Sequence, residues 1–310
     1  MPTFKEFYFD SSDGLHKIHT TACYPDGEVR ATLQIIHGII EYVDKTYERF
    51  MSYLAENGIA CFATDHLGHG RSFQDEKDKG YIADKDGWDY IIRDEETLRL
   101  ISKEQYPDVP QFAFGHSMGS FMLRTLLIRY PDGFDGALVV GTGNQSGLLV
   151  FGGLTAANLV ILFKGTRHRS KLLNDLAFGS YNKIYDKVNT DYDWISSDPA
   201  AVKAYMDDPL CGYLPTCSLF RDMMTGIKFI ENRSNIAKMN KDTPVIFLSG
   251  KKDPVGECGK GVEKAYSLFK AVGMKDISMK LYPEARHAII NEVNKDEVFA
   301  DVLAWINSKI

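Results

Sequence analysis

The chain has 310 residues, of which 44% are apolar and 12% aromatic, an ordinary composition for a globular protein with one large core. Its formal charge of −6 comes from 36 basic and 42 acidic residues spread along the chain. No lysine and arginine block could follow a phosphate backbone, which argues against a nucleic-acid partner. Five cysteines without CxxC spacing favour reduced thiols over a disulfide frame or a zinc site, and the first residues lack a secretory signal pattern. We therefore expect a cytoplasmic protein.

Short apolar runs alternate with helical patterns along the chain. Residues 7–9 and 15–23 predict an antiparallel pair at a sheet edge, and later runs predict further strands at 32–36, 59–64, 111–114, 136–140, 244–249 and 277–282. Apolar spacing typical of helices falls at 49–57, 88–104, 120–130 and 260–273. This alternation predicts an α/β fold with a mostly parallel sheet covered by helices on both faces.

Residues 144–219 interrupt the alternation of strands and helices, because they contain no convincing strand. They open with an apolar stretch at 148–163, shorter than the ~20 residues of a good transmembrane helix. We predict a helical cap inserted between core segments 1–143 and 220–310, either packed on the core or mobile, with an apolar inner face at the entrance to the site. The candidate substrate-contacting residues are Leu148, Leu154, Leu159, Leu162 and Tyr213.

Ser117 is the candidate nucleophile. It lies in the run Gly-His-Ser-Met-Gly at 115–119, between the strand predicted at 111–114 and the helix predicted at 120–130. A serine at such a tight strand-to-helix turn is held in a strained conformation with its hydroxyl exposed above the sheet. Strain of this kind is typical of a functional site.

A serine nucleophile requires a base and an acid that orients the base. His287 follows the predicted strand at 277–282, and Asp253 follows the one at 244–249, so both belong to loops at the carboxyl edge of the sheet. The chain order Ser117, Asp253, His287 is typical of this arrangement. The other seven histidines are better explained by glycine-rich turns or surface positions.

The reaction also needs two donors for the developing oxyanion. One is the amide of Met118, the residue after the nucleophile, at a helix N-terminus. The second is predicted to be the amide of Ile39, in the loop after the first interior strand, where Gly38 lets the backbone approach the substrate.

Five segments now carry a resemblance: HGIIE at 37–41 (with Tyr47), DHLGHGRS at 65–72, GHSMG at 115–119, SGKKD at 249–253 and YPEARH at 282–287. Together they resemble the α/β-hydrolase fold and, within it, the monoacylglycerol lipase and lysophospholipase family, which is grouped with serine aminopeptidase-like hydrolases. The resemblance spans nearly the whole chain and implies the same five roles for Ser117, Asp253, His287, Ile39 and Met118. Tyr42 departs from the family, which commonly has histidine there.

The predicted reaction is hydrolysis of a carboxylic ester through an acyl-enzyme, with no metal or organic cofactor. The resemblance favours monoacylglycerol or lysophospholipid-type esters, and a small-ester carboxylesterase remains an alternative. A proline iminopeptidase-like peptidase would need a carboxylate cluster in the cap, for which five residues are available: Asp191, Asp193, Asp198, Asp207 and Asp208. A catalytically silent ligand-binding protein is the non-enzyme alternative. Oligomeric state and transient contact of the cap with a membrane surface stay open.

Overall fold

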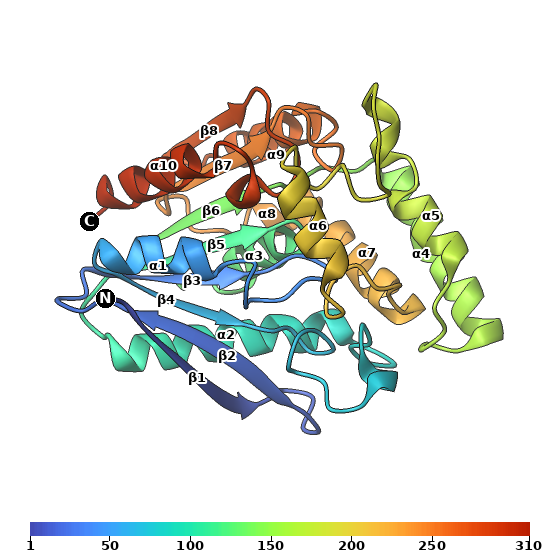
Figure 1. Cartoon of the computed structure of the whole chain (residues 1–310), viewed down its shortest axis with the longest axis horizontal. Helices are drawn as coiled ribbons and strands as arrows, with labels where there is room; N and C mark the ends of the chain where they lie inside the picture. The colour runs from blue at the N-terminus through green and yellow to red at the C-terminus, as the bar shows by residue number, and fades with distance from the viewer.

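An eight-stranded sheet forms the centre of the computed structural model, which describes all 310 residues (Figure 1). The strands run in the order β1-β2-β4-β3-β5-β6-β7-β8. Their bounds are β1 (Thr3–Asp10), β2 (Lys17–Tyr24), β3 (Ala31–Ile36), β4 (Ile59–Thr64), β5 (Gln111–His116), β6 (Gly136–Val140), β7 (Val245–Gly250) and β8 (Ile277–Tyr282). β2 pairs antiparallel with β1 and with β4, and every other pairing is parallel. The predicted mostly parallel sheet with an antiparallel edge pair is confirmed.

Helices cover both faces of this sheet. One apolar cluster joins the sheet to α1 and α10, and a second joins it to α2, α3, α7 and α9. The helices are α1 (Glu48–Glu56), α2 (Gly87–Gln105), α3 (Met118–Arg129), α4 (Gly147–Lys164), α5 (Lys171–Phe178), α6 (Pro199–Asp207), α7 (Cys217–Ile230), α8 (Arg233–Ile236), α9 (Lys260–Ala271) and α10 (Lys295–Asn307), with short 3₁₀ turns at Glu76–Asp78, Tyr181–Ile184 and Ile289–Asn291. Every residue of β3, β4 and β5 is buried, as expected of parallel strands covered on both sides.

The segment between β6 and α7 forms a separate helical layer. α4, α5 and α6 lie beyond the carboxyl ends of the central strands, on the side of the molecule opposite the two termini (Figure 1). The only β-pairing here is a single bridge between Arg169 and Thr216. We call residues 147–207 the cap layer; the limits 144–219 of an inserted domain stay a prediction.

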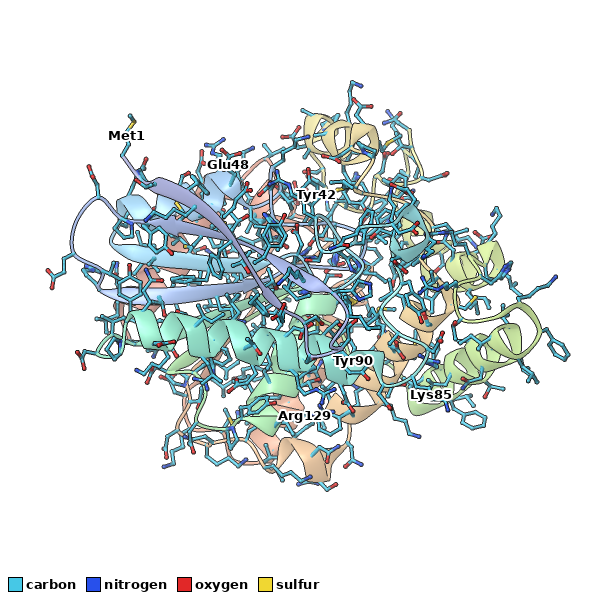
Figure 2. The ribbon with its side chains drawn as sticks, turned by 90° about the horizontal axis from the view of Figure 1, so that it is seen from below. Met1, Tyr42, Glu48, Lys85, Tyr90 and Arg129 are labelled. Carbon is cyan, nitrogen blue, oxygen red and sulfur yellow. The ribbon has the colours of Figure 1, made fainter.

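Helix α4 is apolar on all sides, and most of it is exposed. Val150 and Ala157 alone are buried, whereas six large apolar side chains of the helix face solvent. By length and composition α4 is the one helix that could cross a membrane, with a mean hydropathy of 1.8 and 11% of its residues buried. The helix therefore packs on the molecule along a narrow stripe only. In Figure 2 the side chains of α4 and α5, drawn in yellow-green, project outward at the end of the molecule near the Lys85 label.

Candidate active site

Ser117 occupies the sharp turn between β5 and α3, at the middle of the sheet. Its backbone has φ 55° and ψ −121°, a conformation that costs a non-glycine residue about 1–3 kcal/mol. The Ser117 amide donates to the carbonyl of Val140 on the neighbouring strand at 3.0 Å, which helps to hold the turn. A side chain at Gly119 would place its Cβ 2.0 Å from the carbonyl oxygen of Ile36, so only glycine lets α3 pack this closely on β3. The predicted strand, tight turn and helix are all present.

His287 and Asp253 are joined by a hydrogen bond beside this turn. His287 Nδ1 lies 3.0 Å from Asp253 Oδ2, and both side chains are buried. Asp253 Oδ1 accepts the amide of Val255 at 2.8 Å, and its Oδ2 also accepts the hydroxyl of Ser249 at 3.2 Å. With both oxygens held as acceptors, the carboxylate favours the proton on His287 Nδ1 and leaves Nε2 free to act as a base. Ser117 Oγ makes no hydrogen bond to His287 here, which is common before substrate binds.

Aromatic side chains of the cap layer cover His287. The ring of Trp194 lies 5.2 Å from that of His287, and Phe178 and Tyr181 pack against Trp194 in turn. The backbone joins the same two segments, since the amide of Ala288 donates to the carbonyl of Ile195 at 2.7 Å. The loop that carries His287 is therefore fixed between the sheet edge and the cap layer. Trp194 lies in the segment 144–219 predicted as a cap, but sequence reasoning did not place it against His287.

The backbone amides near Ser117 that have no hydrogen-bond acceptor in the chain include the two predicted oxyanion donors. These are Met118, at the first position of α3, and Ile39, in the loop after β3. The loop approaches Ser117 closely, because a Cβ on Gly38 would lie 3.0 Å from the Ser117 Cβ. Unpaired donors on both sides of a serine are the arrangement that stabilises an oxyanion. Both are the amides predicted from the sequence, and their role as oxyanion donors is a proposal.

A second buried pair, formed by His116 and Glu41, lies beneath the site and was missed by sequence reasoning. His116 Nδ1 is 3.1 Å from Glu41 Oε1, and its Nε2 is 3.3 Å from the carbonyl oxygen of His287. Glu41 also accepts the hydroxyl of Tyr47 at 2.7 Å. Burial opposes the charge on each partner, yet Glu41 raises the pKa of His116, and His116 lowers that of Glu41. The pair ties the loop after β3 to the loop that carries His287.

The cap layer is also fastened to the loop after β3. The carbonyl of Ile40 accepts both the hydroxyl of Tyr205 and the amide of Gly212, each at 3.1 Å. Ile40 itself has φ 50°, which is uncommon for a β-branched residue and is held by these contacts. Tyr42, labelled in Figure 2, donates its hydroxyl to Asp208 at 2.9 Å. Tyr42 thus contacts the residue that directly follows the cap layer.

The five predicted substrate-contacting residues fall into two groups. Leu148, Leu159 and Leu162 are exposed on α4, with 82%, 52% and 74% of their surfaces accessible. Leu154 and Tyr213 are partly buried against the larger apolar cluster. Any contact of the exposed three with substrate would occur at the surface of the cap layer, and a role for all five stays a prediction. The chain contains no group of three histidine, cysteine or acidic side chains that could hold a metal ion.

Comparison with known proteins places this architecture among hydrolases. A family model described as serine aminopeptidase, S33, matches residues 27–294. The chain is 26% identical to a monoacylglycerol lipase of Mycolicibacterium smegmatis, over 92% of this chain and 91% of that protein. It is also 26% identical to a mouse monoglyceride lipase, over 92% of this chain and 85% of that one. A carboxyl esterase from Bacillus coagulans, solved with glycerol, superimposes with a TM-score of 0.92 at 28% identity, covering 99% of this chain and 98% of the esterase.

Proposed function

The chain belongs to the serine aminopeptidase S33 family of α/β-hydrolases, and we propose that it hydrolyses carboxylic esters of lipids through an acyl-enzyme on Ser117. One observation supports this most strongly. A strained serine at the end of the central strand has an Asp253–His287 pair and two unpaired amides around it. Those are the parts that acyl transfer needs, namely a nucleophile, a base held in one tautomer, and donors for the oxyanion.

In the proposed reaction His287 Nε2 takes the proton of Ser117 as the hydroxyl oxygen attacks the ester carbonyl. The negative charge that develops on the carbonyl oxygen is stabilised by the amides of Ile39 and Met118. Asp253 stabilises the imidazolium, which then protonates the leaving alcohol. Water enters, gives its proton to His287, and releases the acid from the acyl-enzyme by the same path.

Monoacylglycerols are the substrates that we propose first. The relatives named as monoacylglycerol and monoglyceride lipases match along almost the whole chain, and the similar esterase structure holds glycerol. Lysophospholipids and small esters would use the same catalytic parts, so the acyl chain and the alcohol distinguish the candidates. A silent ligand-binding protein would have no need for the strain stored at Ser117.

The cap layer supports transient contact with a lipid surface. Its two first helices expose a set of large apolar side chains: Leu148, Leu149, Phe151, Leu159, Leu162, Phe163, Leu172 and Leu176. Lys164 ends the first of these helices, Arg167 lies in the turn after it, and Lys171 begins the second helix. Apolar side chains bordered by cations are typical of surfaces that lie in the headgroup region of a membrane. We propose that α4 and α5 rest on the lipid from which the substrate is taken.

A peptidase of the proline iminopeptidase kind is the weaker alternative. Such an enzyme would hold the substrate amino group with carboxylates of the cap, but four of the five candidates already have partners, and the fifth, Asp191, is exposed. Asp207 pairs with Lys203, and Asp208 pairs with Lys45. Asp198 caps α6, and Asp193 accepts backbone amides of its own loop. Asp193 and Asp207 line one surface cavity, but Lys187, Lys203 and Arg286 line it as well.

We also propose a cytoplasmic location. All five cysteines are free thiols, and four of them are buried. Unpaired thiols are typical of a reducing compartment.

Turnover and labelling test the proposed function together. Ser117→Ala should lower hydrolysis by roughly 10⁶-fold while the protein stays folded, because the residue forms the acyl-enzyme. A fluorophosphonate probe should label wild type at Ser117 and react more slowly with His287→Ala. Labelling at another serine, or an active Ser117→Ala enzyme, would refute the mechanism.

A series of p-nitrophenyl esters and monoacylglycerols of increasing acyl-chain length tests the proposed substrate. The rate of hydrolysis should be highest for an acyl chain longer than acetate, whereas a maximum at acetate would favour a small-ester esterase.

A further inference from the structure

Two consecutive peptide groups of the loop after β3 have almost all their hydrogen-bonding capacity occupied. In the first, the carbonyl of His37 lies 3.0 Å from His66 Nε2, and the amide of Gly38 donates to Glu41 Oε1 at 2.5 Å. In the second, the carbonyl of Gly38 lies 2.7 Å from His37 Nδ1. The fourth group, the amide of Ile39, has no acceptor in the chain. Of the four hydrogen-bonding groups in these two peptides, the amide of Ile39, proposed as the oxyanion donor, is therefore the single one left free.

The surroundings of His37 determine which of its ring nitrogens carries the proton. The backbone amide of His66 donates to His37 Nε2 at 3.0 Å, so that nitrogen is an acceptor. Burial lowers the pKa of His37 well below its usual range, and the neighbouring rings of His66 and His69 lower it further. A neutral ring that accepts at Nε2 must carry its proton on Nδ1. That proton points to the carbonyl of Gly38.

We propose that His37 is a positioning residue that aims and polarises the oxyanion donor through the Gly38–Ile39 peptide; the inference rests on the proposed function. The carbonyl of Gly38 and the amide of Ile39 belong to one planar trans peptide, so a hydrogen bond that fixes the carbonyl also fixes the direction of the N–H. A hydrogen bond accepted by the carbonyl also strengthens the N–H as a donor, because linked hydrogen bonds polarise one another.

The packing of His37 makes this arrangement rigid. Its ring is fully buried and stacks on that of His66, with 3.7 Å between the ring centroids. His66 is held in its turn by Glu95, whose Oε1 lies 3.1 Å from His66 Nδ1. The Glu95 carboxylate also accepts the side-chain amide of Gln34, on β3 itself. His37 thus takes its orientation from β4 and α2, and it transmits that orientation to the loop.

Two amide variants separate the hydrogen bond from the packing. The side-chain nitrogen of His37→Asn can occupy the place of Nδ1 and donate to Gly38, whereas that of His37→Gln reaches only the place of Nε2. Both variants lose the ring and its stacking. We expect His37→Gln to lower kcat for a p-nitrophenyl ester by on the order of 10–100-fold with little change in KM, a part of the loss seen when an oxyanion donor is removed. We expect His37→Asn to recover most of this loss.

Binding of a tetrahedral adduct provides the second measurement. A trifluoromethyl ketone forms an oxyanion on the serine, so its inhibition constant should weaken in His37→Gln by the same factor as kcat/KM. The matching secondary alcohol, which forms no adduct, should bind all three proteins alike. Thermal unfolding should show similar stability for the two variants.

Equal activity of the Asn and Gln variants, or a loss confined to KM, would overturn the role of His37. An inactive wild-type protein that the fluorophosphonate does not label would instead refute the proposed function. The two failures are therefore distinguishable.

Discussion

Replacement of Asp253 by asparagine should disable the base without disturbing the fold. Oδ1 of Asp253 accepts the backbone amide of Val255 at 2.8 Å, so the amide oxygen of an asparagine must take that position. Its NH₂ group then faces His287 Nδ1, at the 3.0 Å position now held by an acceptor. Two donors cannot share one hydrogen bond, so His287 must move its proton to Nε2 and can no longer accept one from Ser117. A proton on the wrong ring nitrogen lowers kcat on the order of 10⁴-fold, which corresponds to an increase of about 5.5 kcal/mol in the activation free energy.

The assay compares kcat on a soluble p-nitrophenyl ester with the rate of fluorophosphonate labelling, since both depend on activation of Ser117. Ser249→Ala is the matched control. It removes the other donor to Asp253 Oδ2, at 3.2 Å, but leaves the tautomer of His287 unchanged, so its loss should stay below about tenfold. A folded Asp253→Asn enzyme with activity within tenfold of wild type would refute the assignment of Asp253 as the orienting acid.

Two further predictions concern stability and lipid binding. Burial, together with nearby carboxylates, raises the pKa of Asp222 from 3.8 to about 7 despite its pairing with Arg221. The folded state of the wild type therefore loses stability as the pH rises from about 4 to about 7. Asp222→Asn resembles the protonated acid at every pH. We expect the variant to be more stable than wild type at pH 8, by up to about 4 kcal/mol, and similar to it at pH 4. Urea unfolding at the two pH values measures this, and a destabilised variant at pH 8 would contradict it. Phe151→Ser and Phe163→Ser, on the exposed face of α4, should each weaken sedimentation with phospholipid vesicles about tenfold while soluble-ester turnover is unchanged. Tyr8→Ser, at an exposed aromatic on β1, is the control, and vesicle binding that falls equally in all three would contradict a specific role for α4.

The central sheet could be predicted from the sequence because its strands are buried on both faces. Continuous apolar runs at 59–64 and 136–140 give the bounds of β4 and β6 as the structure has them. The edge strand β8, at 277–282, instead alternates apolar residues with Ser278 and Lys280, and its bounds also agree. The same logic located Ser117, Asp253 and His287 at strand ends, where the structure joins Asp253 and His287 by a hydrogen bond.

Other parts of the site could not be derived in this way. His116 meets Glu41 across 75 positions of the chain, and a lone buried histidine carries no local signal of such a partner. Helix α4 is apolar all round, so no periodicity indicates which side packs and which is exposed. The contact of Trp194 with His287 likewise depends on how the cap layer folds back over the sheet. Each of these features is a tertiary contact between segments remote in sequence.

The carbonyl of Ile40 accepts hydrogen bonds from Tyr205 and Gly212. These bonds limit which residues can be exchanged in chimeras with related hydrolases. A graft that replaces all of residues 144–219 would remove both donors and leave this carbonyl unsatisfied, at a cost of about 1–3 kcal/mol if it stays buried. A graft that exchanges α4 and α5 but keeps residues 205–212 would leave the loop beside Ser117 as it is. In the region between β6 and α7, α4 and α5 can therefore be exchanged, whereas residues 205–212 should be kept together with the sheet and the loop beside Ser117.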